Sequence, residues 1–400
     1  MTTKALSHIR ILDLTHMLSG PYATQLLSDL GAETIKVEPP GKGEGTRRLL
    51  ENDPEHSIDG MGAYFLTLNR NKKSICIDLK KKQGLELFYQ LVEKADIVVN
   101  NFRTGVSKKL NIDYPKLMEI NPKIISCSIT GYGETGPRSK AVSFDLAAQA
   151  TGGGMSITGS PSHPLRSGIP IGDLGGGFMG SIGILTALLA REQTGRGQHV
   201  DISMQDAQVS MLNYMATMYF LSGKQPPAIG NSHFVHVPYD SFATNDGHII
   251  IAIITDSLWE KFCELSKLDS LNTAENKVQP GRLKNRELIM QTLAELIKTK
   301  SNAYWCDLLQ NNGIPCAPVN TFSDVLRDPQ ILARNMVVEV SHPNGKKVQQ
   351  VGNPIKLSEC DHDDFTPPPL LGQQTDEIMK SLLNYSDANI SALKESGAIQ

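Results

Sequence analysis

Apolar and polar positions follow two alternating patterns along the first half of the chain. Short apolar runs predict strands, and stretches with apolar positions three and four residues apart predict helices between them. The predicted strands are His8–Leu14, Glu33–Val37, Ser74–Asp78, Asp96–Val99, Lys123–Ile129 and Gln198–Ile202, and the predicted helices are Tyr22–Leu30, Gln83–Lys94, Gly176–Arg191 and one from Met204. This alternation is typical of parallel βαβ units and predicts an α/β protein with a large Rossmann-like, parallel-sheet domain. Ligands of such sheets bind at the carboxyl ends of the strands.

The pattern changes near Pro226. A hairpin is predicted over Ser241–Ile254 with Asn245-Asp246-Gly247 as its turn, followed by helices at Arg286–Lys298 and Asn302–Asn311. We therefore expect a smaller α+β domain at residues 226–319. The large domain would comprise residues 1–225 and 320–400.

Composition and charge narrow the classes of function. The 400 residues include 39 basic and 42 acidic side chains, a net charge of −3, and no basic tract, so no nucleic-acid or membrane partner is expected. The first residues lack the apolar core of a signal peptide, and no uninterrupted apolar run reaches the roughly 20 residues of a membrane helix. The six cysteines are scattered and include no Cys-x-x-Cys pair. We therefore expect a protein of the reducing cytoplasm, with no metal site.

One glycine-rich segment matches a nucleotide-binding pattern. Gly131-Tyr132-Gly133-Glu134-Thr135-Gly136 fits G-x-G-x-x-G after a predicted strand. Pro137 and Arg138 follow it instead of an apolar helix, which argues against a nicotinamide cofactor and hence an oxidoreductase. The segment is more simply a glycine turn at the end of a strand, and another phosphate-bearing ligand is left open there.

Basic and aromatic residues recur just after predicted strands. The basic ones are Arg70, Lys72, Arg103 and Lys109, and Phe102 and Tyr132 offer flat surfaces to a base. Singly, such cations are usually solvated surface charges. Together, at the carboxyl edge of an open sheet, they suit an anionic, nucleotide-like ligand.

Asp173 is the most suggestive carboxylate in the sequence. It stands in Gly172-Asp-Leu-Gly-Gly-Gly directly before an apolar helix, where an aspartate is favoured simply as an N-cap. Capping does not explain the glycines, because glycine at a helix start weakens the helix. We interpret the glycines as clearance for a bulky substrate, and expect nearby backbone N–H groups to keep the carboxylate ionised.

Three histidines are candidate contacts for a substrate. His16, His233 and His236 have no metal-ligand spacing, so each is first a hydrogen-bonded structural residue and second a substrate contact.

The motifs together resemble the family III CoA-transferases of the CaiB/BaiF type, which include formyl-CoA, carnitine and oxalate CoA-transferases. The resemblance spans nearly the whole chain and rests on the shared order of individually weak motifs. These are Leu12-Asp-Leu-Thr-His-Met-Leu-Ser-Gly-Pro, Ile35-Lys-Val-Glu-Pro-Pro-Gly-Lys-Gly, Asn101-Phe-Arg-Thr-Gly, Gly131-Tyr-Gly-Glu-Thr-Gly-Pro, Gly172-Asp173, Gly195-Arg-Gly-Gln-His-Val-Asp, Gly313-Ile-Pro-Cys-Ala-Pro-Val and Pro368-Pro-Leu-Leu-Gly-Gln-Gln-Thr-Asp.

The resemblance implies a site and a mechanism. The catalytic aspartate falls on Asp173, and the CoA-binding positions fall on Arg70, Asn71, Lys72, Asn101, Phe102, Arg103, Lys109, Gly131, Tyr132, Gly133 and Glu134. The activity implied is transfer of CoA from an acyl-CoA donor to a carboxylic acid through a covalent aspartyl intermediate, with CoA as substrate and no tightly bound cofactor. The resemblance also implies that this chain forms an interlocked, ring-like homodimer.

Two departures and two alternatives bear on specificity. Leu18 replaces a glutamine of the formyl-CoA branch, and Pro226–Pro238 has a single glycine where that branch has a glycine-rich shielding loop. Formyl-CoA and oxalate are therefore not the expected substrates, and His16, Leu18, His233 and His236 would shape a different acceptor pocket.

The related α-methylacyl-CoA racemases need a second base, but their histidine falls on Phe144 and their glutamate on Ala243. A non-catalytic CoA-binding protein is the alternative of another class.

Overall fold

The computed structural model describes residues 4–361 and 363–400. Contacts within the chain divide it into two compact units. The first comprises residues 1–155, 166–224 and 329–400, and the second residues 156–165 and 225–328. The domain boundaries expected near residues 225 and 320 stay a prediction.

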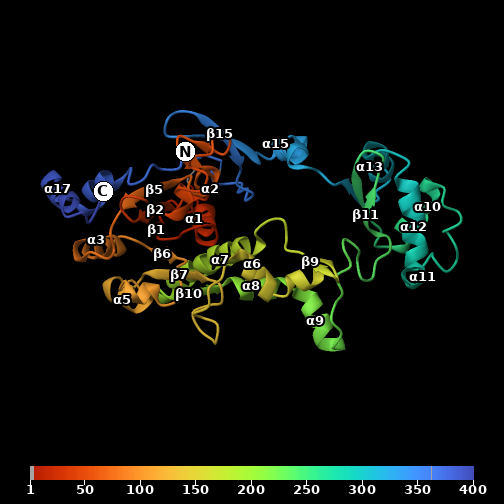
Figure 1. The fold of residues 1–400 in the computed structure, drawn as a ribbon, viewed down its shortest axis with the longest axis horizontal. Coiled ribbons are helices and arrows are strands. Elements are labelled where there is room, and N and C mark those ends of the chain that lie inside the picture. Colours follow the sequence, from red (N-terminus) through yellow and green to blue (C-terminus); the bar gives the residue numbers. More distant parts are fainter. Residues whose placement is uncertain (1–3, 362) are drawn as a thin grey trace. The chain divides into compact units, whose positions relative to one another are not determined.

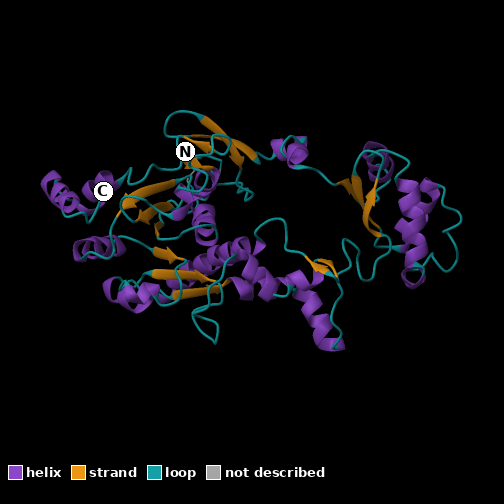
Figure 2. Cartoon of the chain, viewed as in Figure 1, coloured by secondary structure: helices purple, strands orange, loops and turns teal. Residues whose placement is uncertain are grey.

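A six-stranded parallel sheet organises the first unit (Figure 1). Its order is β10 (His199–Ser203), β7 (Ile125–Thr130), β6 (Ile97–Asn100), β1 (Arg10–Asp13), β2 (Glu33–Glu38) and β5 (Lys72–Cys76). Strands and helices alternate along the chain in this unit, so the predicted α/β class with a large parallel sheet is confirmed (Figure 2). The chain builds β1, β2 and β5 to one side and β6, β7 and β10 to the other. The order therefore reverses between β1 and β6, where open α/β sheets place their ligands.

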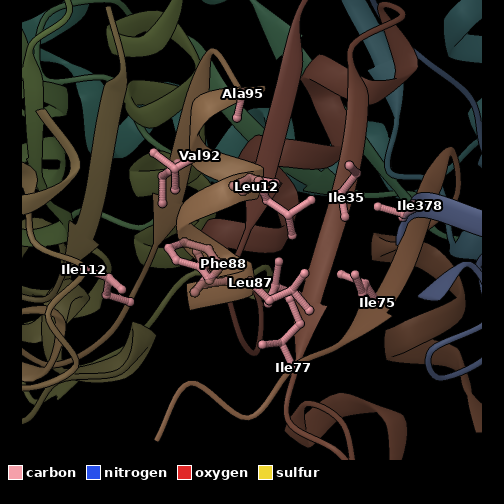
Figure 3. Close-up of a cluster of buried hydrophobic side chains, with 14 of the residues drawn as sticks. Leu12, Ile35, Ile75, Ile77, Leu87, Phe88, Val92, Ala95, Ile112 and Ile378 are labelled. Atoms are coloured by element: carbon pink, nitrogen blue, oxygen red, sulfur yellow. The ribbon is translucent and has the colours of Figure 1, made fainter. Parts of the chain in front are cut away.

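Apolar side chains on alternate strand positions bury both faces of this sheet. On one face Leu12, Ile35 and Ile75 meet Leu87 and Phe88 of α3 (Lys82–Glu93), as Figure 3 shows. The helices α5 (Tyr114–Ile120), α16 (Thr375–Leu383) and α17 (Asp387–Glu395) complete this cluster. On the other face Ile11, Val99 and Cys127 pack against α1 (Ser19–Asp29), α7 (Ile171–Thr194) and α8 (Met204–Met211).

Helix α7 begins five residues earlier than the sequence pattern predicted. Its glycines are buried against neighbouring elements: a Cβ on Gly177 would lie 2.8 Å from the Ser19 carbonyl oxygen, and one on Gly175 would lie 2.4 Å from the Met211 methyl. The interpretation of these glycines as clearance for a substrate is therefore wrong. They let α1 and α8 approach α7 closely. By length and hydropathy α7 could also cross a membrane, but its buried face packs into the core of this unit.

The second unit is a smaller α+β body. Strands β11 (Tyr239–Ala243), β12 (His248–Ala252) and β13 (Cys316–Pro318) form an antiparallel sheet, with the predicted turn between the first two. Trp259 and Phe262 of α10 (Asp256–Ser266), Leu293 of α12 (Arg286–Ile297) and Trp305 of α13 (Asn302–Gln310) fill its core.

The remaining elements are short. They are η1 (Gly45–Arg47), β3 (Ser57–Ile58), β4 (Met61–Gly62), α2 (Ala63–Leu68), α4 (Val106–Lys109), α6 (Asp145–Thr151), η2 (Gly154–Ile157), β8 (Gly159–Ser160), β9 (His163–Pro164), α9 (Asn213–Ser222), α11 (Gln279–Lys284), α14 (Phe322–Val325), α15 (Pro329–Ala333), β14 (Val337–Ser341) and β15 (Lys347–Val351).

Candidate active site

The loops that follow β1 and β6 are joined where the strand order reverses. The backbone N–H of His16 donates to Asn101 Oδ1 at 2.8 Å, and Asn101 Nδ2 donates to the His16 carbonyl oxygen at 2.6 Å. The His16 and Phe102 rings lie 5.5 Å apart, centroid to centroid. This pairing fixes three predicted site residues at one edge of the sheet.

A buried charge cluster holds the loop after β1. Asp13 accepts the Thr15 backbone N–H at 2.8 Å and forms an ion pair with Lys72 at 2.9 Å, while Lys36 Nζ donates to the Thr15 carbonyl oxygen. Burial alone would raise the pKa of Asp13, but the charges of Lys36 and Lys72 outweigh it and hold that pKa well below its usual range. The cluster therefore anchors the segment that leads to His16.

A cavity of about 490 Å³ opens above these loops, within the first unit. Its lining includes seven of the predicted site residues, namely His16, Leu18, Asn101, Phe102, Arg103, Gly131 and Asp173. Burial, followed by the charge of Lys36, lowers the pKa of His16 from its ordinary value of 6.5, so its ring is neutral at neutral pH. The cavity thus combines the carboxylates of Asp145 and Asp173, the neutral imidazole of His16 and the guanidinium groups of Arg103 and Arg166.

Asp173 is the third residue of α7 and does not cap that helix. The cap position is Pro170, and Asp145 of α6 instead accepts the N–H of Gly172 at 2.8 Å and that of Asp173 at 3.3 Å. Burial and the charge of Asp145 raise the pKa of Asp173 from 3.8 to about 6. The expectation that backbone N–H groups stabilise the ionised Asp173 is wrong, because Asp145 takes those donors. At neutral pH Asp173 is still mostly ionised, and it is more basic than an ordinary aspartate.

Gly131 allows one wall of the cavity to close. A Cβ at this position would lie 2.1 Å from Ser143 Cβ, so a side chain would push away the segment that carries Phe144 and Asp145. Tyr132 and Gly133 instead line a neighbouring hollow, and Glu134 faces a third one, where Glu134 Oε2 lies 3.1 Å from His199 Nε2.

Arg70, Asn71 and Lys72 do not line the cavity. Arg70 is 2% exposed, pairs with Asp29 at 2.7 Å and donates to the Val351 carbonyl oxygen, while Asn71 also donates to Asp29. Lys72 is engaged with Asp13. Contact of Arg70 or Lys72 with CoA would require these ion pairs to open, and their role in binding stays a prediction.

Arg103 and Lys109 are exposed cations that follow β6. Arg103 lines the cavity and Lys109 ends α4, three residues after that helix begins. Among residues 4–361 and 363–400, neither forms an ion pair with a carboxylate. Both are therefore available to an anionic ligand.

The two predicted contacts from the other half of the chain, His233 and His236, belong to a different unit. Their part in an acceptor pocket therefore stays a prediction. Within the part of the chain that the structure describes, no group of three or more His, Cys, Asp or Glu side chains is placed to hold a metal ion.

Sequence reasoning missed several residues of the cavity. Arg166 and Tyr64 line it, and the Asp145 carboxylate, considered above only as a neighbour of Phe144, holds the start of α7. The sequence signal for Asp145 is its place at the start of a short helix. Nothing in the sequence connects it to a segment 27 residues further along.

The comparisons with known proteins agree with this geometry. A family model described as CoA-transferase family III matches residues 6–375. The chain is 35% identical over 398 residues to the succinyl-CoA:glutarate CoA-transferase of Homo sapiens, covering 99% of this chain and 90% of that protein. It is 40% identical over 385 residues to the succinyl-CoA:mesaconate CoA-transferase of Haloarcula marismortui, covering 94% of this chain and 96% of that protein. A crystal structure of a CaiB/BaiF family protein from Brucella suis matches with a TM-score of 0.85 and 35% identity, over 96% of this chain and 100% of that one.

An open α/β sheet with a carboxylate cavity at its switch point, together with these matches, defines an enzyme of acyl-CoA chemistry. The chain belongs to CoA-transferase family III, as its motifs predicted, and it transfers CoA between an acyl-CoA and a carboxylic acid.

Proposed function

We propose that Asp173 is the nucleophile of this transfer and carries the covalent intermediates. A carboxylate oxygen of Asp173 attacks the thioester carbonyl carbon of the donor, the C–S bond breaks, and a mixed anhydride and CoA thiolate form. The thiolate attacks the aspartyl carbonyl, which releases the donor acid and leaves an aspartyl-CoA thioester. The acceptor carboxylate attacks this thioester, and the thiolate then attacks the acyl carbonyl of the second anhydride. The products are the new acyl-CoA and free Asp173.

One observation carries this proposal: the cavity places Asp173 with a raised pKa and without a capping role. A carboxylate with a pKa of about 6 is ionised at neutral pH and is a stronger nucleophile than an ordinary aspartate. Since Asp145 accepts the N–H groups at the start of α7, the Asp173 oxygens are not committed to the helix. The steps proposed above are attacks by carboxylates and thiolates, so none of them needs a separate general acid or base.

Arg103 and Lys109 support the binding of CoA beside this nucleophile. A CoA thioester carries a pyrophosphate and a 3′-phosphate, and exposed cations without carboxylate partners suit these groups. We assign the phosphates to this edge of the sheet, with Phe102 in the same cavity as an apolar surface. CoA is in this account a substrate, and no resident cofactor takes part.

The proposed assembly is an interlocked, ring-like homodimer in the cytoplasm. Phe220 and Leu221 of α9 are 81% and 84% exposed, and α7 also exposes Ile182 and Leu189. Large apolar side chains with this much exposure are often covered by a partner, which supports a second copy at these helices. A monodisperse monomer at micromolar concentration in sedimentation would contradict the dimer.

The test is a transfer assay with Asp173 variants. Succinyl-CoA and glutarate are suitable first substrates, because a relative described above is named for them. We expect Asp173→Asn and Asp173→Ala to lose transfer while CoA binding is retained, because an amide or a methyl group cannot form the anhydride. Near-wild-type turnover by Asp173→Asn would contradict the covalent mechanism. Exchange of the substrate α-proton with solvent deuterium, at a rate comparable to turnover, would instead favour racemase chemistry.

A further inference from the structure

Arg166 is a second cation in the cavity that holds Asp173. Its side chain is exposed, and Nη1 donates to the carbonyl oxygens of Ser167 at 3.0 Å and Gly168 at 3.2 Å. Over the described residues it forms no ion pair with a carboxylate. It is not one of the groups that shift the pKa of Asp173. The guanidinium therefore lines a substrate cavity with its charge uncompensated.

Helix α6 fixes the segment between this cation and the nucleophile. The Ser167 N–H donates to Gln149 Oε1 at 2.9 Å, and Gln149 Nε2 donates to Asp145 Oδ2 at 2.8 Å. Asp145 Oδ1 in turn accepts the Gly172 N–H at 2.8 Å. One buried side chain, Gln149, thus links the two ends of the segment that follows Arg166.

This linkage has a consequence for the substrate. Because both ends of residues 167–172 are tied to α6, the backbone that carries Arg166 keeps a defined separation from Asp173. A guanidinium binds a carboxylate through two parallel N–H···O bonds, so it recognises an anion of fixed geometry. With the thioester carbonyl at Asp173, the far end of the same acyl group or acid lies in the cavity that Arg166 lines, where an anionic group would meet its guanidinium.

We propose that Arg166 is a specificity-determining residue that binds the distal carboxylate of a dicarboxylic acid or of its monothioester. The inference rests on the proposed function of Asp173 and names the substrate class of that same site. Arg103 and Lys109 are left for the phosphates of CoA, so the two anionic parts of the substrate meet different cations.

A CoA phosphate is the other anion that Arg166 could bind. Two acyl-CoA donors distinguish binding of a distal carboxylate from binding of a CoA phosphate. Succinyl-CoA and butyryl-CoA carry the same CoA and four-carbon acyl groups, and only succinyl-CoA has a distal carboxylate. We compare steady-state kinetics of the wild type, Arg166→Gln and Arg166→Lys with both donors and glutarate as acceptor, and repeat the acceptor series with glutarate and valerate. Arg196→Gln removes an exposed arginine outside the cavity and is the matched control.

We expect wild type to prefer succinyl-CoA, and Arg166→Gln to lower kcat/KM for succinyl-CoA by about 10- to 100-fold, mainly through KM. The kcat/KM for butyryl-CoA should stay unchanged, and in the acceptor series the kcat/KM for glutarate should fall while that for valerate does not. Arg166→Lys should recover part of the losses, and Arg196→Gln should behave as wild type. Equal losses for both donors would assign Arg166 to a CoA phosphate and overturn the inference, as would no loss for either. Failure of wild type to transfer CoA to any acid would instead overturn the proposed function. Equal melting temperatures of Arg166→Gln and wild type establish that the variant is folded.

Discussion

Asp145 Oδ1 accepts the backbone N–H of Asp173 at 3.3 Å, so one carboxylate caps the helix on which the other stands. Asp145 takes the helix N-terminus, and its charge adds to burial in raising the pKa of Asp173 to about 6. A single aspartate at a helix start would both cap the helix and face the cavity, whereas here Asp145 provides the cap and Asp173 faces the cavity. Asp145 caps α7, and the Asp173 carboxylate takes no part in that cap.

The first prediction concerns the pH dependence of the reaction. Below a pKa of about 6 Asp173 is protonated and cannot attack, so kcat/KM for the donor should fall about tenfold per pH unit on the acid side. Asp145→Asn keeps an oxygen acceptor for the helix but removes the charge, and it should move this limb to lower pH. The measurement is a pH profile of kcat/KM for both proteins. An acid limb at the same pH in both would mean that Asp145 has no electrostatic effect on the reacting group.

The second prediction concerns stability. Asp173 has a folded-state pKa of about 6 and an ordinary value of 3.8, so between these values the folded state binds more protons than the unfolded state. Wild type therefore loses stability as pH rises from 4 to 6, and the full penalty is present above pH 6. Since one pKa unit corresponds to about 1.4 kcal/mol, Asp173→Asn should be more stable than wild type at pH 8 by about 1–3 kcal/mol. Urea unfolding at pH 8 and pH 4 measures this difference, which should shrink at the lower pH. A variant less stable than wild type at pH 8 would contradict it.

The third prediction tests the packing role of the α7 glycines. In an isolated helix Gly→Ala stabilises, but a Cβ on Gly177 would lie 2.8 Å from the Ser19 carbonyl oxygen and 2.9 Å from Tyr22 Cδ1. Gly177→Ala should therefore destabilise the protein by about 1–3 kcal/mol through overpacking. Gly168→Ala is the control, because a Cβ there meets nothing within 4 Å. Equal unfolding midpoints for the two variants would show that α1 does not hold α7 this closely.

The fourth prediction concerns the cations assigned to CoA. Arg103→Ala and Lys109→Ala should each weaken CoA binding by about 1–3 kcal/mol, as for loss of a charge-assisted hydrogen bond. Titration calorimetry with CoA measures this, with Lys123→Ala, an exposed lysine ahead of β7, as the control. Turnover at saturating acyl-CoA should change less. Unchanged affinity in both variants would place the phosphates elsewhere.

The sheet and the candidate nucleophile could be predicted from the sequence because their signals are local. Short apolar runs marked β1, β2 and β6, and the run of residues around Gly172 marked Asp173. The start of α7 was missed because glycines disfavour a helix, whereas close packing on Ser19 and Met211 stabilises it in the folded protein.

The roles of cations and caps depend on partners distant in the chain. In the sequence Arg70 looks like the other cations expected at the edge of the sheet, but its ion pair with Asp29, 41 residues earlier, buries it. Gln149 holds Ser167, which is 18 positions away, and Asp145 holds Gly172, which is 27 positions away. Spacing in a single sequence carries no signal for such pairs, so Arg166 was not recognised as a cavity residue.

The most direct measurement is the intact mass of the protein after incubation with succinyl-CoA and no acceptor. We predict a covalent adduct of the mass of a CoA thioester or of a succinyl anhydride, located on Asp173 by peptide mapping, intercepted by hydroxylamine and absent in Asp173→Asn. An unmodified mass in a wild-type sample that transfers CoA to glutarate under the same conditions, or an adduct that persists in Asp173→Asn, would contradict the central claim.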